Sequence, residues 1–209
     1  MRLLRSSLLI GALVALSVPA AAQSAEGPWM VRIRALSLTP ANKSDAIPSL
    51  GVAADKITIN SKVFPEIDFA YFFSKNFSTE LVLTYPQEQN VMLNGTKIGT
   101  FQHLPPTLLA QYQFLPDETF RPYVGAGVNL TLISNVNITV PGVGALDLAK
   151  SSVGVAGQIG ADYKIAPKQF INLDVKFVTL AADVKKSGSK VSNVQVNPWL
   201  ISIGYGYRF

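Results

Sequence analysis

The stretch "NPWLISIGYGYRF", residues 197–209, decides the fold of this chain. Its odd positions from Trp199 to Phe209 carry large apolar or aromatic side chains. Its even positions from Ser202 to Arg208 carry small or polar ones. Successive side chains of a β-strand point to opposite faces, so this alternation predicts a strand with one apolar face and one polar, glycine-rich face.

Seven further runs of the chain alternate in the same way. The eight runs are residues 29–38, 63–73, 77–85, 107–114, 120–132, 151–163, 169–180 and 196–209. Short turns such as 74–76 alternate along the chain with long links such as 86–104. Strands of about 10 residues with this pattern of connections are typical of outer-membrane barrels. The sequence therefore predicts an all-β fold, an eight-stranded antiparallel transmembrane β-barrel with short periplasmic turns and long extracellular loops.

Two of the long links carry hairpin signals. Asn94-Gly95 is a strong two-residue turn signal, because both residues tolerate a positive φ. Ser187-Gly188 offers a weaker signal of the same kind. We therefore expect the third and fourth strands, and the seventh and eighth, to continue beyond the membrane as ribbons.

A soluble eight-stranded barrel of the lipocalin type is the main alternative, because its strands alternate in the same way around an apolar interior. Two features of the sequence favour a membrane barrel over a soluble one. The polar face of the runs is poor in lysine and rich in glycine, which is unusual for a face in water. The apolar face carries aromatic side chains near the strand ends, as in the interfacial girdles of membrane barrels. These are Trp29, Phe73, Phe77, Tyr85, Phe114, Tyr163, Trp199, Tyr207 and Phe209.

The first residues of the chain form a separate segment. Arg2 and Arg5 precede a short apolar run and then a group of small residues, a pattern typical of a secretory signal peptide. The apolar run is too short to span a bilayer core of roughly 30 Å. We expect a signal peptide at 1–22, with Ala25 as the second choice of cleavage site, and one barrel domain at 23–209.

Composition excludes several other classes of protein. The 209 residues are 48% hydrophobic and 15% charged, which is too apolar for a disordered chain. The absence of cysteine excludes disulfides and thiolate metal sites. The formal charge is only +5, and part of it would leave with the signal peptide. Because no cluster of lysine and arginine accompanies this small surplus, we expect no nucleic-acid partner.

Four blocks of the chain carry a family resemblance. They are "HLPPTLLAQYQF" (103–114), "FRPYVGAGVNL" (120–130), "GQIGADY" (157–163) and "NPWLISIGYGYRF" (197–209). In this order they resemble the characteristic blocks of the OmpW family of small outer-membrane proteins. The resemblance implies a barrel in the Gram-negative outer membrane, with a narrow, rather hydrophobic interior. It also implies a role in the passage of small hydrophobic compounds, by a route thought to leave sideways through the wall.

The polar faces of the strands would line the lumen. Ionised groups in so narrow an interior must pair, because an unpaired buried charge is very costly. We expect a charge network that closes the lower barrel, formed by Arg32, Glu80, Asp162, Asp174, Lys176 and Arg208. Arg34, Asp68 and Arg121 are expected to face the same part of the lumen. Above it we expect a hydrophobic channel lined by Leu36, Val82, Leu109, Val178 and Leu200. The alternative is that these apolar side chains only fill space.

Three prolines bear on the exit from the lumen. Pro86 closes the third run, whereas Pro105 and Pro106 open the fourth, so all three should lie at similar heights on neighbouring strands. Each proline removes one donor from the backbone ladder. The wall could therefore be locally unpaired and form a lateral opening. An equally acceptable interpretation is that the prolines end the strands where the membrane ends.

His103 is the single histidine of the chain. No serine motif such as G-x-S-x-G accompanies it, and without cysteines only carboxylates could join it at a metal. We therefore expect no enzymatic activity, no metal and no cofactor, and a histidine that hydrogen-bonds loop backbone at the outer rim.

The leading functional hypothesis is passive uptake of small hydrophobic molecules across the outer membrane. The alternative is a structural or adhesive receptor barrel with a closed lumen and no transport role. The expected partners are outer-membrane lipid, small hydrophobic solutes and the outer-membrane assembly machinery. The terminal aromatic residue Phe209 fits the signal by which that machinery recognises barrels. The sequence leaves the oligomeric state open.

Overall fold

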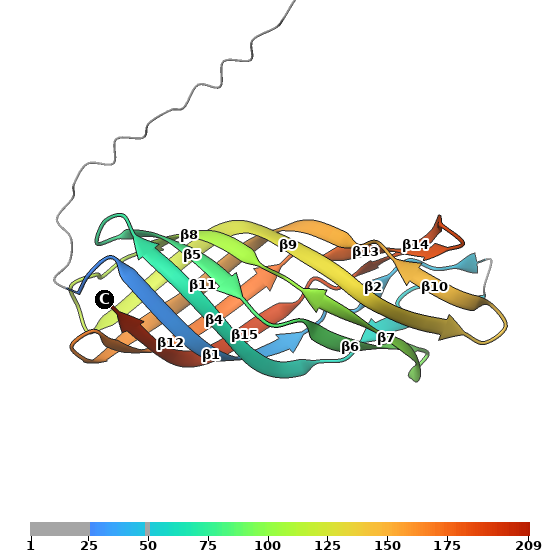
Figure 1. The fold of residues 1–209 in the computed structure, drawn as a ribbon, viewed down its shortest axis with the longest axis horizontal. Helices are drawn as coiled ribbons and strands as arrows, with labels where there is room; N and C mark the ends of the chain where they lie inside the picture. Colours follow the sequence, from blue (N-terminus) through green and yellow to red (C-terminus); the bar gives the residue numbers. More distant parts are fainter. Residues whose placement is uncertain (1–25, 49–50) are drawn as a thin grey trace, which may run out of the picture.

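A computed structural model describes residues 26–48 and 51–209 of the chain, so the predicted signal peptide lies outside the described residues (Figure 1). Eight strands form a barrel that fills one end of the molecule in Figure 1. They are β1 (Trp29–Thr39), β4 (Lys62–Phe72), β5 (Phe77–Leu83), β8 (Thr107–Gln113), β9 (Phe120–Val140), β11 (Ser151–Ala166), β12 (Gln169–Val178) and β15 (Trp199–Arg208). Across the described residues, the structure has no helical segment with the length and hydropathy of a membrane span.

The barrel is closed and antiparallel, as predicted. Each barrel strand pairs with two neighbours in the order β11-β12-β15-β1-β4-β5-β8-β9, and β9 pairs back with β11. The first and last strands lie side by side, in a register that runs from Met30 opposite Arg208 to Thr39 opposite Trp199. The predicted strands therefore pair with no open edge, which is a condition for crossing a lipid bilayer.

The alternation of the sequence becomes an inside-out barrel. Apolar side chains on the outer face are exposed, with Val153 at 77% and Ile33 at 59%, while the charged side chains of the same strands are buried. Aromatic side chains gather in edge-to-face pairs on that outer face, such as Trp29 with Tyr71 at 4.8 Å between ring centroids. Lipid is the solvent that suits such a surface, because hydrocarbon accepts apolar side chains and water does not.

Above the membrane the wall continues as an extension built from the long links, seen at the end of Figure 1 away from the C-terminus. Its strands are β2 (Lys43–Ser44), β3 (Ile57–Ile59), β6 (Gln87–Leu93), β7 (Thr96–Leu104), β10 (Gly144–Leu148), β13 (Ala181–Lys186) and β14 (Ser189–Gln195), together with the upper half of β9. The outward side chains turn polar here, since Asn135 donates to Gln102 at 2.7 Å on the exposed face. The extension therefore lies outside the hydrocarbon.

Both hairpin signals form turns of the extension. Asn94 and Gly95 have φ values of 49° and 80° and join β6 to β7, while Ser187 and Gly188, at 48° and 83°, join β13 to β14. Inside the extension a cluster of buried apolar residues, including Val91, continues the apolar interior upward. The long extracellular links are therefore largely strand, which keeps the interior enclosed well above the membrane.

Candidate functional site

Two arginines of β1 organise the lower lumen. Arg32 donates from Nε and Nη2 to the carboxylate of Asp162 at 3.1 and 2.7 Å, and from Nη1 to Asp68 at 3.1 Å. Its Nη1 also lies 3.3 Å from Glu80 Oε1, and Arg34 Nη2 reaches the same oxygen at 2.9 Å. These side chains are 0–1% exposed. Such bidentate pairs at full burial form a compact plug rather than a water-filled pore.

The upper side of the plug is closed by Lys176 on β12. Its Nζ lies 2.6 Å from Asp174 Oδ1 and 3.3 Å from Glu66 Oε1. Glu66 is also held by Arg34 Nη1 at 2.9 Å, and the hydroxyl of Tyr123 donates to Asp174 Oδ2 at 2.8 Å. One connected network thus contains five of the six predicted members, Arg32, Glu80, Asp162, Asp174 and Lys176.

Arg208 lies apart from this plug, at the periplasmic end. It donates from Nε to the carbonyl of Gly27 at 2.8 Å and stacks over the ring of Phe72, 3.8 Å from the centroid. Its Nη1 is 3.6 Å from Glu26. The prediction that Arg208 belongs to the lumen network is therefore corrected. The reason is the register, which places Arg208 opposite Met30 and thus nearer the barrel end than Arg32.

Glu26 gathers a second, smaller ionic group at that end. Arg121 donates to both of its carboxylate oxygens at 2.6 and 3.0 Å, and Lys164 donates at 2.6 Å. Burial opposes ionisation of Glu26, but these hydrogen bonds and the two positive charges outweigh it and lower its pKa to about 2. Glu26 precedes the first predicted strand, so the alternation of apolar and polar residues could not predict which way its side chain points.

Three more residues belong to the plug: Arg34 and Asp68, which were expected in the lumen, and Glu66, which was not among the expected lumen charges. All three stand on the inward side of predicted runs, so the alternation did contain their signal. With them the plug holds three cations against five carboxylates. Because carboxyl groups outnumber cations, each guanidinium is shared among several acceptors.

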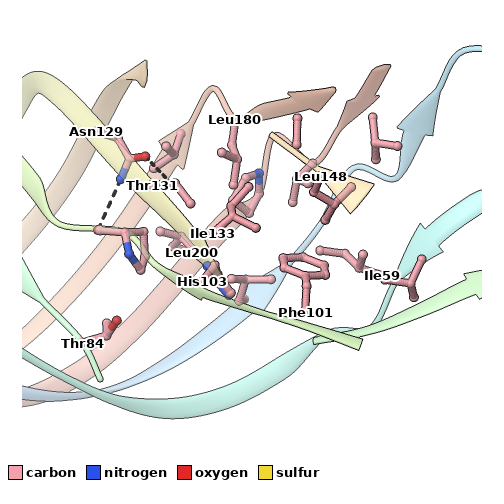
Figure 2. A pocket seen from close by; sticks show the side chains of 18 of the residues that line it. Ile59, Thr84, Phe101, His103, Asn129, Thr131, Ile133, Leu148, Leu180 and Leu200 are labelled. Carbon is pink, nitrogen blue, oxygen red and sulfur yellow. Dashed lines mark hydrogen bonds between the residues drawn. The ribbon is translucent and has the colours of Figure 1, made fainter. Parts of the chain in front are cut away.

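An apolar cavity lies above the plug and reaches into the extension (Figure 2). Its volume, counted as the space open to the centre of a water molecule, is about 80 Å³. Four of the predicted channel residues line it: Leu36, Val82, Val178 and Leu200. The extension supplies the upper walls, including Ile59, Phe101, Ile133, Leu148 and Leu180, which project into the same space in Figure 2.

Leu109 is not among the residues that line this cavity, which corrects its predicted role. It is 1% exposed and packs with Val82, Ala156 and Val178 below the cavity. Its partner across the strand pair is Glu80, a member of the plug. Leu109 therefore fills space between the plug and the cavity floor.

The wall is interrupted where the prolines lie. The ladder between β5 and β8 stops at Val82 opposite Thr107, and the ladder between β6 and β7 resumes at Gln87 opposite His103. The third and fourth barrel strands are thus each split in two, and the two splits face each other. On the other side Leu130 donates to the carbonyl of Pro106 at 3.0 Å, so the pairing to β9 persists.

A shallow hollow lies on the lipid-facing side of this interruption. Its walls include Pro106 and the outward side chains Leu81, Leu108 and Val128. Pro105 lines the inner cavity, whereas Pro86 is exposed and lines neither space. Asn129 lines both the cavity and the hollow. Asn129 belongs to β9, so the wall between the two spaces includes this strand beside the proline segment.

Asn129 on β9 binds the proline segment of the fourth barrel strand. Its Nδ2 donates to Thr107 Oγ1 at 2.7 Å and reaches the carbonyls of Pro105 and Pro106 at 3.3 and 3.4 Å. Thr131 donates to Asn129 Oδ1 at 2.7 Å, as the dashed lines of Figure 2 indicate. These hydrogen bonds strengthen the pairing of the fourth barrel strand with β9 and leave the interruption between the third and fourth strands without a bridge of this kind.

His103 differs from its expected role at the rim. It is 4% exposed, lines the cavity, and has its Nε2 3.3 Å from Nε2 of Gln89 rather than on loop backbone. Burial, assisted by the charge of Lys62, lowers the pKa of His103 to about 4. The ring is therefore neutral at pH 7.

Comparison with known proteins agrees with this geometry. Residues 25–209 match the model of the OmpW family. The chain is 34% identical to the uncharacterised outer-membrane protein y4mB of Sinorhizobium fredii over 93% of this chain and 88% of that one. It is 31% identical to outer membrane protein W of Vibrio cholerae over 96% and 97%. The crystal structure of the outer membrane protein OprG from Pseudomonas aeruginosa superposes with a TM-score of 0.76 at 29% identity, covering 88% of this chain and 96% of that chain.

A closed eight-stranded barrel with an apolar outer face and an ion-paired interior defines an outer-membrane β-barrel protein. The chain belongs to the OmpW family. It is a protein of the Gram-negative outer membrane, surrounded there by membrane lipid. The family and the fold predicted from the sequence are both confirmed. None of the relatives reported above is named as an enzyme. The expected absence of catalytic activity in this chain stays a prediction.

Proposed function

We propose that this barrel carries small hydrophobic molecules passively across the outer leaflet, through the apolar cavity and sideways through the wall interruption into the membrane. The observation that most supports this proposal is that three structural features lie one after another along a single path. The apolar cavity extends upward into the extension, the ion-paired plug blocks its floor, and the residues at the interruption, Thr84, Pro105 and Thr107, line its side. A solute that enters from outside therefore has a shorter way into lipid than into the periplasm.

The plug argues against passage straight through. An apolar solute would have to separate buried ion pairs such as Arg32 with Asp162, and exposing buried charges to an apolar partner is very costly. The sideways route crosses the wall between the third and fourth barrel strands, where no ladder pairs join residues 83–86 to residues 104–106. Lipid then receives the solute without any need for a water-filled pore.

The cavity is tested by blocking it. Val82→Trp adds an aromatic ring to the cavity wall without adding charge, and it should abolish protein-dependent uptake of n-octane by proteoliposomes. Ile203→Trp is the matched control, since Ile203 lies 55% exposed on the lipid face, away from both the cavity and the hollow. Uptake that survives Val82→Trp in a folded barrel would favour the structural or adhesive alternative with a closed lumen.

The exit is tested separately. Replacing Pro105 and Pro106 by alanine restores two backbone donors to the fourth barrel strand, which should extend the ladder and slow uptake. Amide hydrogen exchange across residues 104–107 reports whether the ladder closes. If the ladder closes and n-octane uptake stays at the wild-type rate, the lateral opening is wrong and the solute leaves by another route.

We also propose that Phe209 is the signal for barrel assembly. Its ring is 51% exposed on the outer face, while its backbone exchanges hydrogen bonds with Trp29 at 2.8 and 3.1 Å. The ring is therefore free to be recognised while the backbone is fixed. Phe209→Ala should reduce assembly in cells but not refolding of purified protein into vesicles, and an equal loss in both assays would contradict a recognition role.

A further inference from the structure

We infer that the cavity binds uncharged apolar solutes that carry a carbonyl oxygen, and that Nδ1 of His103 donates a hydrogen bond to this oxygen. This inference rests on the proposed function, because it names the class of solute that the same cavity takes. His103 lies near the end of β7 and is one of the cavity-lining side chains labelled in Figure 2. At 4% exposure the ring is almost wholly removed from bulk water.

Nδ1 of His103 is a buried polar atom without a partner. Within residues 26–48 and 51–209, eight buried side-chain oxygen or nitrogen atoms have no hydrogen-bond partner. Two of these eight belong to residues that line the cavity, namely Thr84 Oγ1 and His103 Nδ1. A buried polar group without a partner costs free energy, because it has given up its hydrogen bond to water. A solute that pairs with Nδ1 therefore gains an interaction that an alkane cannot make.

The contact between Gln89 and His103 determines whether Nδ1 donates or accepts. Nε2 of Gln89 lies 3.3 Å from Nε2 of His103. An amide nitrogen can only donate, so the histidine nitrogen that faces it must accept. The ring is neutral at pH 7, since burial lowers the pKa of His103 to about 4. A neutral imidazole has one acceptor and one donor nitrogen, so Nδ1 carries the hydrogen and can only donate.

A carbonyl oxygen is the solute group that matches this single donor. It accepts a hydrogen bond and brings no hydrogen of its own. A hydroxyl group could accept the same bond, but its own hydrogen would then need an acceptor. The neighbours of His103 on the cavity wall are apolar, namely Phe101 two residues earlier on β7 and Ile133 opposite on β9. A group that only donates, such as the N–H of an indole, cannot pair with Nδ1 at all.

The charges around the cavity favour an uncharged solute. The charged residues that line the cavity, Lys176 and Glu66, are paired with each other at 3.3 Å. Lys62, whose charge also acts on His103, does not line the cavity, and its ammonium group donates to the carbonyl of Glu88 at 3.1 Å. A carboxylate would therefore find no free counter-charge on the cavity wall, and burying it unpaired is very costly. Neutral ketones, aldehydes and esters avoid this cost.

The strand register places this donor next to the wall interruption. His103 stands opposite Gln87 in the first ladder pair of β6 with β7 above the interruption. Thr84 lies below this pair, three residues before Gln87, and the bond from His103 to the carbonyl oxygen does not require it. Because apolar side chains such as Leu36 and Leu200 line the rest of the cavity, they suit the tail of the solute. The carbonyl end is thus held at the level of the proposed exit.

The single histidine gives a direct test by NMR. Untagged protein labelled with ¹⁵N-histidine and with ¹³C-methyl leucine and valine, embedded in lipid nanodiscs, has one imidazole spin system. Before any solute is added, Nδ1 rather than Nε2 should carry the hydrogen, and the opposite tautomer would overturn the inference. Titration with 2-octanone should shift the Nδ1–H resonance of His103 and the methyl resonances of Leu36 and Val82. Titration with n-octane should shift the methyl resonances alone.

Two outcomes of these titrations separate the inference from the proposed function. Methyl shifts with both solutes but no Nδ1–H shift with 2-octanone would overturn the inference and leave the proposed function intact. No methyl shift with either solute would contradict the proposed function itself. At equal concentrations in the bilayer 1-octanol should bind more weakly than 2-octanone, and tighter binding of 1-octanol would overturn the choice of a carbonyl group.

Substitution of the histidine measures the strength of the bond. His103→Phe keeps an aromatic ring and removes the donor, so it should weaken 2-octanone binding about five- to tenfold, the effect of one hydrogen bond, without changing n-octane binding. Thr84→Val is the matched control, because it removes the other unpartnered polar atom of the cavity wall, and it should bind 2-octanone as the wild type does. Equal 2-octanone affinity in His103→Phe and the wild type, or an equal loss in Thr84→Val, would overturn the inference.

Discussion

Replacing Arg32 by methionine should be among the most damaging single changes in the barrel. The variant keeps a side chain of similar length but removes the contacts with Asp162, Asp68 and Glu80, at 2.7 to 3.3 Å. The plug then holds two cations against five carboxylates. Breaking a buried ion pair costs about 3–5 kcal/mol, because the partner is left uncompensated. We expect a loss of that size in the free energy of unfolding, since these carboxylates are 0–1% exposed.

The assay is equilibrium urea unfolding of the barrel in lipid vesicles, followed by tryptophan fluorescence. Lys75→Met is the matched control, because it breaks the ion pair with Asp117 in an exposed periplasmic turn, where the two side chains are 41% and 69% exposed. Such surface pairs contribute about 0–1 kcal/mol. If Arg32→Met costs no more than Lys75→Met, the carboxylates have access to water and the reasoning that the plug is dry and closed is refuted.

Three further predictions concern the wall and the barrel end. Ile203→Arg puts a charge on the lipid face and should lower the free energy of unfolding by about 2–4 kcal/mol in the same assay, the cost of an arginine near the bilayer midplane. An unchanged free energy of unfolding would contradict the orientation of this face towards lipid. Gly127→Ala places a Cβ against the backbone oxygen of Leu108 on β8 and should cost about 1–3 kcal/mol, whereas Gly157→Ala, with open space around it, should be nearly neutral. Equal costs of the two substitutions would refute the packing argument. Glu26→Gln should lower the free energy of unfolding above pH 4.5. The difference in unfolding free energy between variant and wild type should disappear as the pH falls towards about 2, because protonation of the wild-type carboxyl removes the same ion pairs. A difference independent of pH would refute the ionic role of Glu26.

Much of the barrel could be predicted because alternation is a local property. The period of two in "NPWLISIGYGYRF" assigns each side chain to a face without any knowledge of its neighbours. β9 shows the limit, since its predicted run ends at 132 but the strand continues to Val140. Above the membrane both faces of the wall change their surroundings, so the apolar–polar alternation weakens although the backbone stays extended.

Height in the lumen could not be predicted in the same way. Leu109 and Val82 both face inward, yet Leu109 lies opposite Glu80 at the level of the plug while Val82 lines the cavity. Arg208 faces inward like Arg32 but lies nearer the barrel end. Height depends on the stagger of each strand against the next, and that stagger is fixed by pairing between distant segments. The local sequence thus determines which face of the wall a side chain occupies. Its height along the barrel axis is determined only when the strands pair and the barrel closes.

The pairing of β1 with β15 affects how the barrel folds. These strands are the first and last of the barrel in the chain, yet they form ten register pairs. Contacts between segments so distant in the chain are slow to form, because loop-closure entropy is lost before they can stabilise the structure. Until β15 arrives, both β1 and β12 present unpaired edges that invite aggregation. A chain interrupted before Trp199 should therefore yield no smaller barrel but an open sheet, which makes completion of the fold an all-or-none event at its final strand.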